Sequence, residues 1–172
     1  MNCIVNVTPD WGIGCAGRLA VSIHADLKRF RALTTGGSVL LGRKTLATFP
    51  GGRPLKNRRN LILTHDPAFS VEGAEVLHSV DAALARAASL GDTLWLIGGE
   101  SIYRQFLPYC SLVRLTRTFV DVPCDAFFPD LDKLTGWSVC WQSEPMEEDG
   151  IRFQYLDYCN ASPLPVSQEV GA

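Results

Sequence analysis

The chain has 172 residues, 47% of them hydrophobic and 20% charged, and a formal net charge of −2. These values are typical of a single globular domain and exclude disordered, collagen-like and coiled-coil chains. No apolar run reaches the roughly 18 residues of a membrane-spanning helix, and the basic residues form no stripe of the kind that binds nucleic acid.

The predicted elements begin with a strand at Cys3–Val7 and a helix at Ala25–Thr35, separated by the long loop Thr8–Ile23. The loop is rich in glycine and has no clear hydrophobic period, whereas the helix has apolar residues at helical spacing. Long loops inside compact domains often carry function.

The elements that follow alternate short apolar runs with amphipathic stretches. In chain order we predict a strand at Val39–Leu41, a helix at Arg43–Phe49, strands at Asn60–Thr64 and Glu75–Leu77, a helix from Ser79 to Ala88, a strand at Thr93–Ile97, a helix at Glu100–Leu107 and a strand at Leu112–Val120. Apolar strands joined through helices are typical of a parallel sheet with helices on both faces.

The end of the chain has a different pattern. Trp137–Ser143 and Ile151–Tyr158 flank the acidic turn Glu147–Gly150, which predicts an antiparallel hairpin. The predicted fold class is therefore α/β: one domain with a mostly parallel central sheet, an antiparallel C-terminal edge hairpin and helices on both faces. We expect this domain to span residues 1–159, and residues 160–172, which have two prolines and no period, to form a flexible tail.

Six cysteines and three histidines are the residues to examine for disulfides or metal ligands. No CxxC pair is present and the histidines lie far apart, so we predict no metal site. The even number of cysteines is compatible with three disulfides, but a domain of this size needs no such cross-links. We therefore predict a cytoplasmic protein with six reduced thiols, at Cys3, Cys15, Cys110, Cys124, Cys140 and Cys159.

Two predicted strand-to-helix junctions contain glycine, Leu41–Thr45 and Ile97–Ser101. Ligands of open α/β sheets bind at the carboxyl ends of strands, where glycine lets the backbone approach and the next helix offers free N–H groups to a phosphate. Two such junctions favour a dinucleotide ligand, although tight turns alone explain the glycines equally well. Neither a GxxxxGK[ST] loop nor a GxGxxG fingerprint is present.

Asp26 is the acid best placed for chemistry, because it follows the long loop and lies among apolar residues such as Val21, Leu27 and Phe30. Loss of solvent raises the pKa of a carboxyl group, which suits proton chemistry or the binding of a protonated heterocycle. An aspartate in a first helical turn also complements the helix dipole, and the local pattern by itself favours that structural role.

Seven short motifs occur in one order along the chain: WGIG at Trp11–Gly14, IHADLKRF at Ile23–Phe30, LLGRKT at Leu40–Thr45, FPGGRPLKNRRN at Phe49–Asn60, IGGESIY at Ile97–Tyr103, LT at Leu115–Thr116 and DAFFP at Asp125–Pro129. Through these motifs the chain resembles the dihydrofolate reductase family, bacterial type, from residue 1 to about Tyr158. Each motif is short, but their combination and order are specific.

The resemblance implies NADPH-dependent reduction of 7,8-dihydrofolate to tetrahydrofolate. It implies that Asp26 hydrogen-bonds the pterin ring with Thr116 as its partner across the pocket, and these two are the expected catalytic residues. Arg58 is expected to pair with the α-carboxylate of the substrate. The other expected substrate-binding residues are Ile4, Val5, Leu27, Phe30, Phe49, Leu55 and Ile97.

The resemblance also implies that NADPH binds at the two glycine junctions. Arg43, Thr64 and His65 are expected at its 2′-phosphate, and Gly98-Gly99 matches a glycine pair that the family usually joins by a cis peptide. The expected cofactor-binding residues are Asn6, Ile13, Gly14, Gly42, Arg43, Lys44, Thr45, Thr64, His65, Gly98, Gly99, Glu100, Ser101, Ile102 and Tyr103.

Three positions depart from the family pattern. Val21 stands where bacterial members usually have tryptophan, Asn6 where alanine is usual, and His24 where proline is usual. Two other functions stay open, a reductase of riboflavin synthesis with the same fold and a pterin- or NADPH-binding protein without catalysis. We expect a monomer with a small-molecule substrate and with no nucleic-acid or membrane partner.

Overall fold

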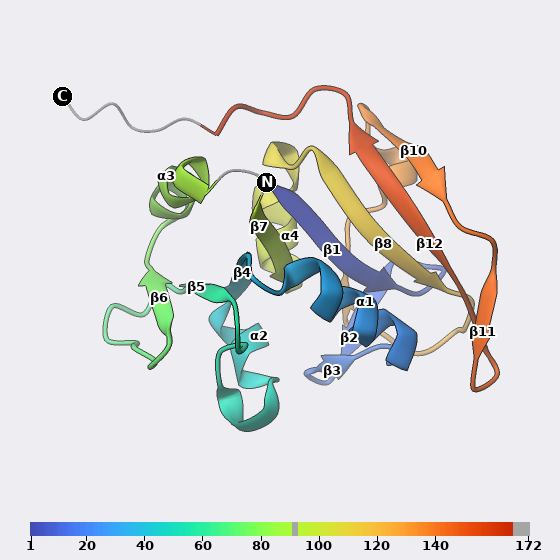
Figure 1. Ribbon diagram of the computed structural model, residues 1–172, viewed down its shortest axis with the longest axis horizontal. Coiled ribbons are helices and arrows are strands. Elements are labelled where there is room, and N and C mark those ends of the chain that lie inside the picture. The colour runs from blue at the N-terminus through green and yellow to red at the C-terminus, as the bar shows by residue number, and fades with distance from the viewer. Residues whose placement is uncertain (91–92, 167–172) are drawn as a thin grey trace.

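The computed structural model describes residues 1–90 and 93–166. Its main sheet is built from β1 (Asn2–Val7), β4 (Ser38–Gly42), β5 (Arg59–Leu63), β6 (Ala74–Leu77), β7 (Leu94–Gly98), β8 (Leu112–Thr118), β10 (Trp137–Gln142), β11 (Met146–Glu148) and β12 (Ile151–Asn160). The strand order is β10-β12-β8-β1-β7-β4-β5-β6, with β11 paired to β12 (Figure 1). Strands β1 and β4 to β8 pair in parallel, whereas β12 is antiparallel to each of its partners.

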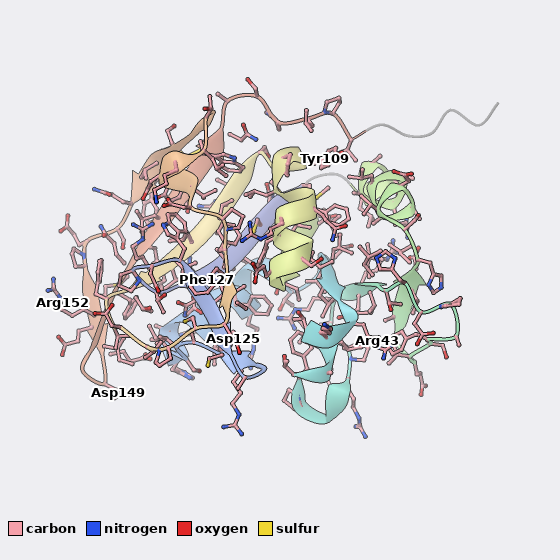
Figure 2. All side chains as sticks on the ribbon, turned by 180° about the vertical axis from the view of Figure 1, so that it is seen from behind. Arg43, Tyr109, Asp125, Phe127, Asp149 and Arg152 are labelled. Atoms are coloured by element: carbon pink, nitrogen blue, oxygen red, sulfur yellow. A yellow bond between two sulfur atoms is a disulfide. The ribbon has the colours of Figure 1, made fainter. Side chains whose placement is uncertain are left out.

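Within the described residues, four α-helices cover the sheet: α1 (His24–Thr34), α2 (Arg43–Ala47), α3 (Val80–Leu90) and α4 (Glu100–Phe106). Helix α1 lies in front of the sheet in Figure 1, and α4 lies on the opposite face, which Figure 2 shows from behind. Because side chains alternate along a strand, residues of β4 pack on both faces of the sheet. Val39 and Leu41 pack with the Phe30 side of α1, and Leu40 packs with α3 and α4. The predicted fold class is confirmed.

The two strands predicted at the C-terminal edge pair antiparallel as expected, β10 with β12, but the segment between them differs from the prediction. The turn joins β11 to β12, so Glu147 and Glu148 belong to a strand instead of the turn. Asp149 and Gly150 form the turn with φ values of 51° and 80°, as a two-residue turn with positive φ requires. Strand β11 pairs with the near end of β12 and β10 with its far end, because β12 is ten residues long and offers one edge to two partners.

The predicted long loop contains two short strands. β2 (Gly12–Cys15) and β3 (Arg18–Leu19) form a small sheet with β9 (Ala126–Phe127), in the order β3-β2-β9. Strands of two to four residues are too short to show a hydrophobic period, which is why the sequence pattern indicated only a loop. Single-turn 3₁₀ helices occur at Pro50–Gly52, Leu107–Tyr109 and Leu131–Lys133.

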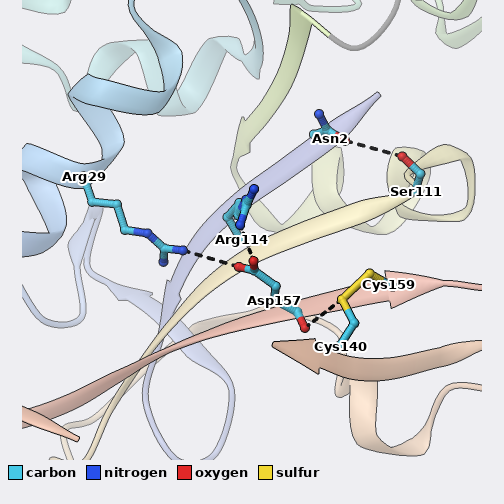
Figure 3. Close-up of a disulfide and its surroundings, with 7 residues drawn as sticks. All are labelled: Asn2, Arg29, Ser111, Arg114, Cys140, Asp157 and Cys159. Atoms are coloured by element: carbon cyan, nitrogen blue, oxygen red, sulfur yellow. Dashed lines mark hydrogen bonds and ion pairs between the residues drawn. A yellow bond between two sulfur atoms is a disulfide. The ribbon is translucent and has the colours of Figure 1, made fainter. Parts of the chain in front are cut away.

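The prediction of six reduced thiols is wrong for one pair. Cys140 on β10 and Cys159 on β12 form a disulfide, with their Cα atoms 5.9 Å apart (Figure 3). The two cysteines are 19 residues apart in sequence, and the antiparallel pairing of the two strands is what brings them together. The remaining four cysteines are free thiols.

The predicted tail begins with an attached segment. The N–H of Ala161 donates to the carbonyl of Gly136 at 2.8 Å, the N–H of Leu164 donates to the carbonyl of Pro108 at 2.9 Å, and Val166 packs against the core. These contacts attach residues 161–166 to the domain, and residues 167–172 of the predicted tail lie outside the described residues. In the described parts of the chain, no helix has the length and apolar character to cross a membrane.

Candidate active site

Asp26 lies in the first turn of α1, and its carboxylate receives a donor at each oxygen. The hydroxyl of Thr116 on β8 donates to Oδ1 at 2.6 Å, and Nδ2 of Asn6 on β1 donates to Oδ2 at 3.2 Å. Neighbouring parallel strands β1 and β8 place these two side chains in register, Asn6 beside Thr116. Thr116 was expected to share the pterin amino group with Asp26 through a water, and in this structure its hydroxyl also bonds the carboxylate directly.

Burial raises the pKa of the Asp26 carboxyl above its ordinary value. The hydrogen bonds from Thr116 and Asn6 and the charge of Arg29 act in the opposite direction and only partly compensate. A first-turn aspartate exposed to water, placed there only for the helix dipole, would have neither this burial nor these donors. The tertiary structure therefore favours the chemical role of Asp26 over the dipole role.

The N-terminus of α1 is capped from a distant part of the chain. The Ncap residue, Ile23, provides no side-chain hydrogen bond. Glu148 of β11 instead accepts from the backbone N–H of His24 at 2.5 Å and of Ala25 at 3.1 Å. This contact ties the helix that carries Asp26 to the C-terminal hairpin, and it was missed in the sequence because the partners are more than 120 residues apart.

An apolar cluster lies on the α1 side of the sheet. It contains most of the residues expected to contact the substrate, namely Ile4, Phe30, Phe49, Leu55 and Ile97. Val5 belongs to the core cluster on the other side of the sheet. Leu27 is 45% exposed and belongs to neither cluster, so its contact with a substrate would require a ligand to cover it.

Arg58 is oriented before any ligand binds. Its Nε donates to the hydroxyl of Thr34 at 3.0 Å, its Nη1 donates to the carbonyl of Lys56 at 2.7 Å, and its guanidinium lies 5.8 Å from the ring centre of Phe30. The side chain therefore stands at the rim of the apolar cluster with a planar set of donors suited to a carboxylate.

A cavity of about 1360 Å³ lies beside this cluster. Every residue expected to bind the cofactor lines it, and so do Val5 and Ile97 from the expected substrate set. The cavity therefore meets the apolar cluster at Ile97, near the end of β7. Residues that sequence reasoning did not assign to it include Cys15, Arg18, Leu19, Asp66 and Asp125.

The two glycine junctions face each other in this cavity. The Gly98–Gly99 peptide is cis, as the resemblance implied. A Cβ on Gly99 would lie 3.1 Å from Oγ1 of Thr45, and one on Gly42 would lie 3.3 Å from Cγ1 of Ile102. Side chains at these positions would fill the space between the junctions, so the glycines keep open a backbone-lined cradle suited to a diphosphate.

At one end of the cavity, Arg43 combines a charge with a fixed orientation. Its Nη1 is 2.6 Å from Oδ2 of Asp66, and its guanidinium lies 5.2 Å from the ring centre of Phe69. Lys44, Thr64 and His65 line the same cavity. These residues supply the cationic and hydroxyl donors that a phosphate group needs. The donor set and the cradle together fit NADPH.

Asp125 fastens the loop that covers the cavity. Its N–H donates to the carbonyl of Gly14 at 3.0 Å, and its carboxylate accepts from the N–H of Ala16 at 2.9 Å. Figure 2 shows Asp125 just before Phe127 of β9. The DAFFP motif contained this residue, but nothing in the sequence indicated that its carboxylate would hold the turn between β2 and β3.

Residues 1–160 match the family model described as dihydrofolate reductase. The dihydrofolate reductase of Neisseria meningitidis serogroup B is 33% identical over 147 residues, covering 85% of this chain and 89% of the relative. The mouse enzyme (Mus musculus) is 34% identical over 179 residues, covering 92% and 96%.

A solved structure of similar shape is the dihydrofolate reductase from Enterococcus faecalis complexed with NADP(H) and RAB-propyl. It superposes with a TM-score of 0.83 at 29% sequence identity, covering 92% of this chain and 95% of that one.

Proposed function

Because the chain belongs to the dihydrofolate reductase family, we propose that it reduces 7,8-dihydrofolate to tetrahydrofolate with NADPH. The observation that carries this function is the half-buried Asp26 carboxylate, hydrogen-bonded to Thr116, beside a cavity with two glycine junctions. An acid that recognises the pterin and a cradle for a dinucleotide thus lie next to each other on one sheet.

NADPH, when bound, supplies the hydride that reaches C6 of the pterin. The residues of the chain bind, orient and shield the reactants. Asp26 accepts hydrogen bonds from N3 and the 2-amino group of the pterin, a geometry that favours a protonated ring. Thr116 steadies the same carboxylate, and the N5 proton comes from solvent.

Residues of the β2–β3 loop exclude bulk water from the reacting atoms. Ile13 and Gly14 line the cavity, and Asp125 holds the turn that follows them. Exclusion of water strengthens the interactions of the Asp26 carboxylate with a charged ring.

The remainder of the substrate lies along the apolar cluster. Phe30, Phe49 and Leu55 contact its benzoyl group, and Arg58 binds its α-carboxylate through two parallel hydrogen bonds. Arg43, Thr64 and His65 bind the 2′-phosphate of NADPH, and the cradle formed by the glycine junctions binds its diphosphate.

We place this reaction in the cytoplasm, with a monomeric enzyme that has no nucleic-acid or membrane partner. A reducing compartment opposes the Cys140–Cys159 disulfide, so thiol counting on protein taken directly from cells tests the location. Sedimentation or light scattering of the purified protein tests the monomeric state.

The decisive experiment is the dihydrofolate-dependent loss of NADPH absorbance with purified protein. Activity with dihydrofolate and none with a ribosylated pyrimidine of riboflavin synthesis supports the proposal, and the reverse pattern overturns it. Tight binding of both ligands without turnover would identify a non-catalytic binding protein, for which Val21 and Asn6 would then mark the lost activity.

A further inference from the structure

Asn6 stands between the cofactor cavity and the substrate acid. It lies near the carboxyl end of β1, lines the cavity and is half-buried. Its Nδ2 donates to Oδ2 of Asp26 at 3.2 Å and also approaches the carbonyl of Val21 at 3.4 Å. One side chain therefore contacts the active-site helix, the end of the loop and the cavity that holds the cofactor.

The orientation of the Asn6 amide follows from its partners. A carbonyl oxygen only accepts hydrogen bonds, and so does an ionised carboxylate. With acceptors at Val21 and at Asp26, the nitrogen must face them and the amide oxygen must point away. A neutral Asp26 would place a proton on one carboxyl oxygen and would gain less from two donors.

We propose that Asn6 is a positioning residue that holds the Asp26 carboxylate ionised and in one orientation, as the second donor beside Thr116. The effect of Asn6 on turnover rests on the proposed function, whereas its effect on the Asp26 carboxylate does not. Because Thr116 binds Oδ1 and Asn6 binds Oδ2, the two donors together fix the plane of the carboxylate. A pterin then meets a carboxylate whose orientation is already set.

Other titratable and charged groups face Asp26 from each element packed around it. Arg29 on α1 lowers the carboxyl pKa through its charge. Tyr103 on α4 and Tyr155 on β12 have pKa values raised by burial and, to a smaller extent, by the charge of Asp26. Glu148 of β11 lies at the N-terminus of α1 and also acts on Tyr155. Replacement of Asn6 leaves this whole set in place.

The test is a pH titration of Asp26 in the protein without ligands, monitored through the NMR chemical shift of its carboxyl carbon. Asn6→Leu removes the donor and keeps the side-chain volume. The matched control is Asn2→Leu, which changes the same residue type on the same face of β1 beside Ser111. We expect the midpoint of Asp26 to rise by about half a pH unit or more in Asn6→Leu, equal to roughly a threefold change in the protonation equilibrium. Asn2→Leu should leave it unchanged.

A second measurement uses the unmodified protein and so does not depend on folding of the variant. The side-chain amide resonances of Asn6 should titrate with the same midpoint as Asp26, because the amide N–H donates a hydrogen bond to the Asp26 carboxylate. If the leucine variant does not fold, Asn6→Ala replaces it. Two results would overturn the inference. One is an Asp26 titration midpoint that stays the same in a folded Asn6 variant, and the other is Asn6 amide resonances whose shifts do not change as Asp26 titrates.

The two proposals fail in different ways. A protein without dihydrofolate turnover, in which the Asp26 midpoint still depends on Asn6, contradicts only the proposed function. A protein with turnover and an unmoved midpoint contradicts only the role of Asn6. When both hold, the acid-side fall of dihydrofolate reduction should move to higher pH in Asn6→Leu, because the carboxyl of Asp26 then ionises at a higher pH.

Discussion

The carboxylate of Glu148 accepts the backbone N–H of His24 at 2.5 Å, so the C-terminal hairpin supplies the cap that α1 lacks in its own sequence. An acid at a helix N-terminus satisfies free N–H groups and complements the helix dipole. Since Asp26 is the third residue of α1, this contact also sets where the active-site acid stands.

Loss of this cap should weaken both stability and activity. We expect Glu148→Ala to lower the free energy of unfolding by about 1 kcal/mol, the usual cost of a lost N-cap, and to reduce dihydrofolate turnover through displacement of Asp26. Urea unfolding and steady-state kinetics measure the two effects. Glu147→Ala, at the exposed neighbouring position on β11, is the control. Equal effects of the two variants would contradict a capping role.

Asp26→Asn should nearly abolish dihydrofolate reduction while NADPH binding is retained. The amide keeps the size of the side chain but removes the charge that favours a protonated pterin. Kinetics and a cofactor-binding titration measure the two outcomes. Asp81→Asn, which changes the first-turn aspartate of α3, serves as control. If both variants keep most of their activity at neutral pH, Asp26 has only the helix-dipole role.

The pH dependence of stability should reveal the half-buried carboxyl of Asp26. Burial raises the pKa of Asp26 in the folded protein above its ordinary value of 3.8, so the folded state binds the proton more tightly than the unfolded state. The stabilising contribution of Asp26 to the free energy of unfolding is therefore fully present below the ordinary pKa of 3.8 and is lost as the pH rises through the pKa of the folded protein. Denaturant unfolding across this pH window should show a fall in the free energy of unfolding of the wild type. The same fall should be absent in Asp26→Asn. Parallel curves for the two proteins would contradict the raised pKa.

Arg43→Ala should reduce the preference for NADPH over NADH. Charge-assisted hydrogen bonds to a phosphate contribute about 1.5–3 kcal/mol each, and partial exposure of Arg43 reduces this value, so we expect the KM for NADPH to rise about tenfold with little change for NADH. The control is Arg86→Ala, because Arg86 forms a similar ion pair with Glu75 away from the cavity. A similar rise for both cofactors would remove Arg43 from the 2′-phosphate site.

Much of the architecture followed from local pattern. The fully apolar run at Val39–Leu41 predicted a buried strand, and the strand is buried on both faces. Glycine at the ends of β4 and β7 predicted close approach to a ligand, and a cavity lies at both places. Strand burial, helix spacing and glycine at sharp turns are properties of neighbouring residues, so they can be predicted from the sequence without knowledge of the fold.

The contacts that define the acid were decided by the tertiary structure. Asn6, Thr116 and Glu148 lie 20 to more than 120 residues in sequence from the α1 residues that they contact. No local rule predicts which strands will lie beside the helix. The Cys140–Cys159 disulfide depends likewise on the register of β10 against β12. Composition and periodicity describe what a segment prefers, whereas a hydrogen bond between distant segments exists only after packing has brought both partners out of water.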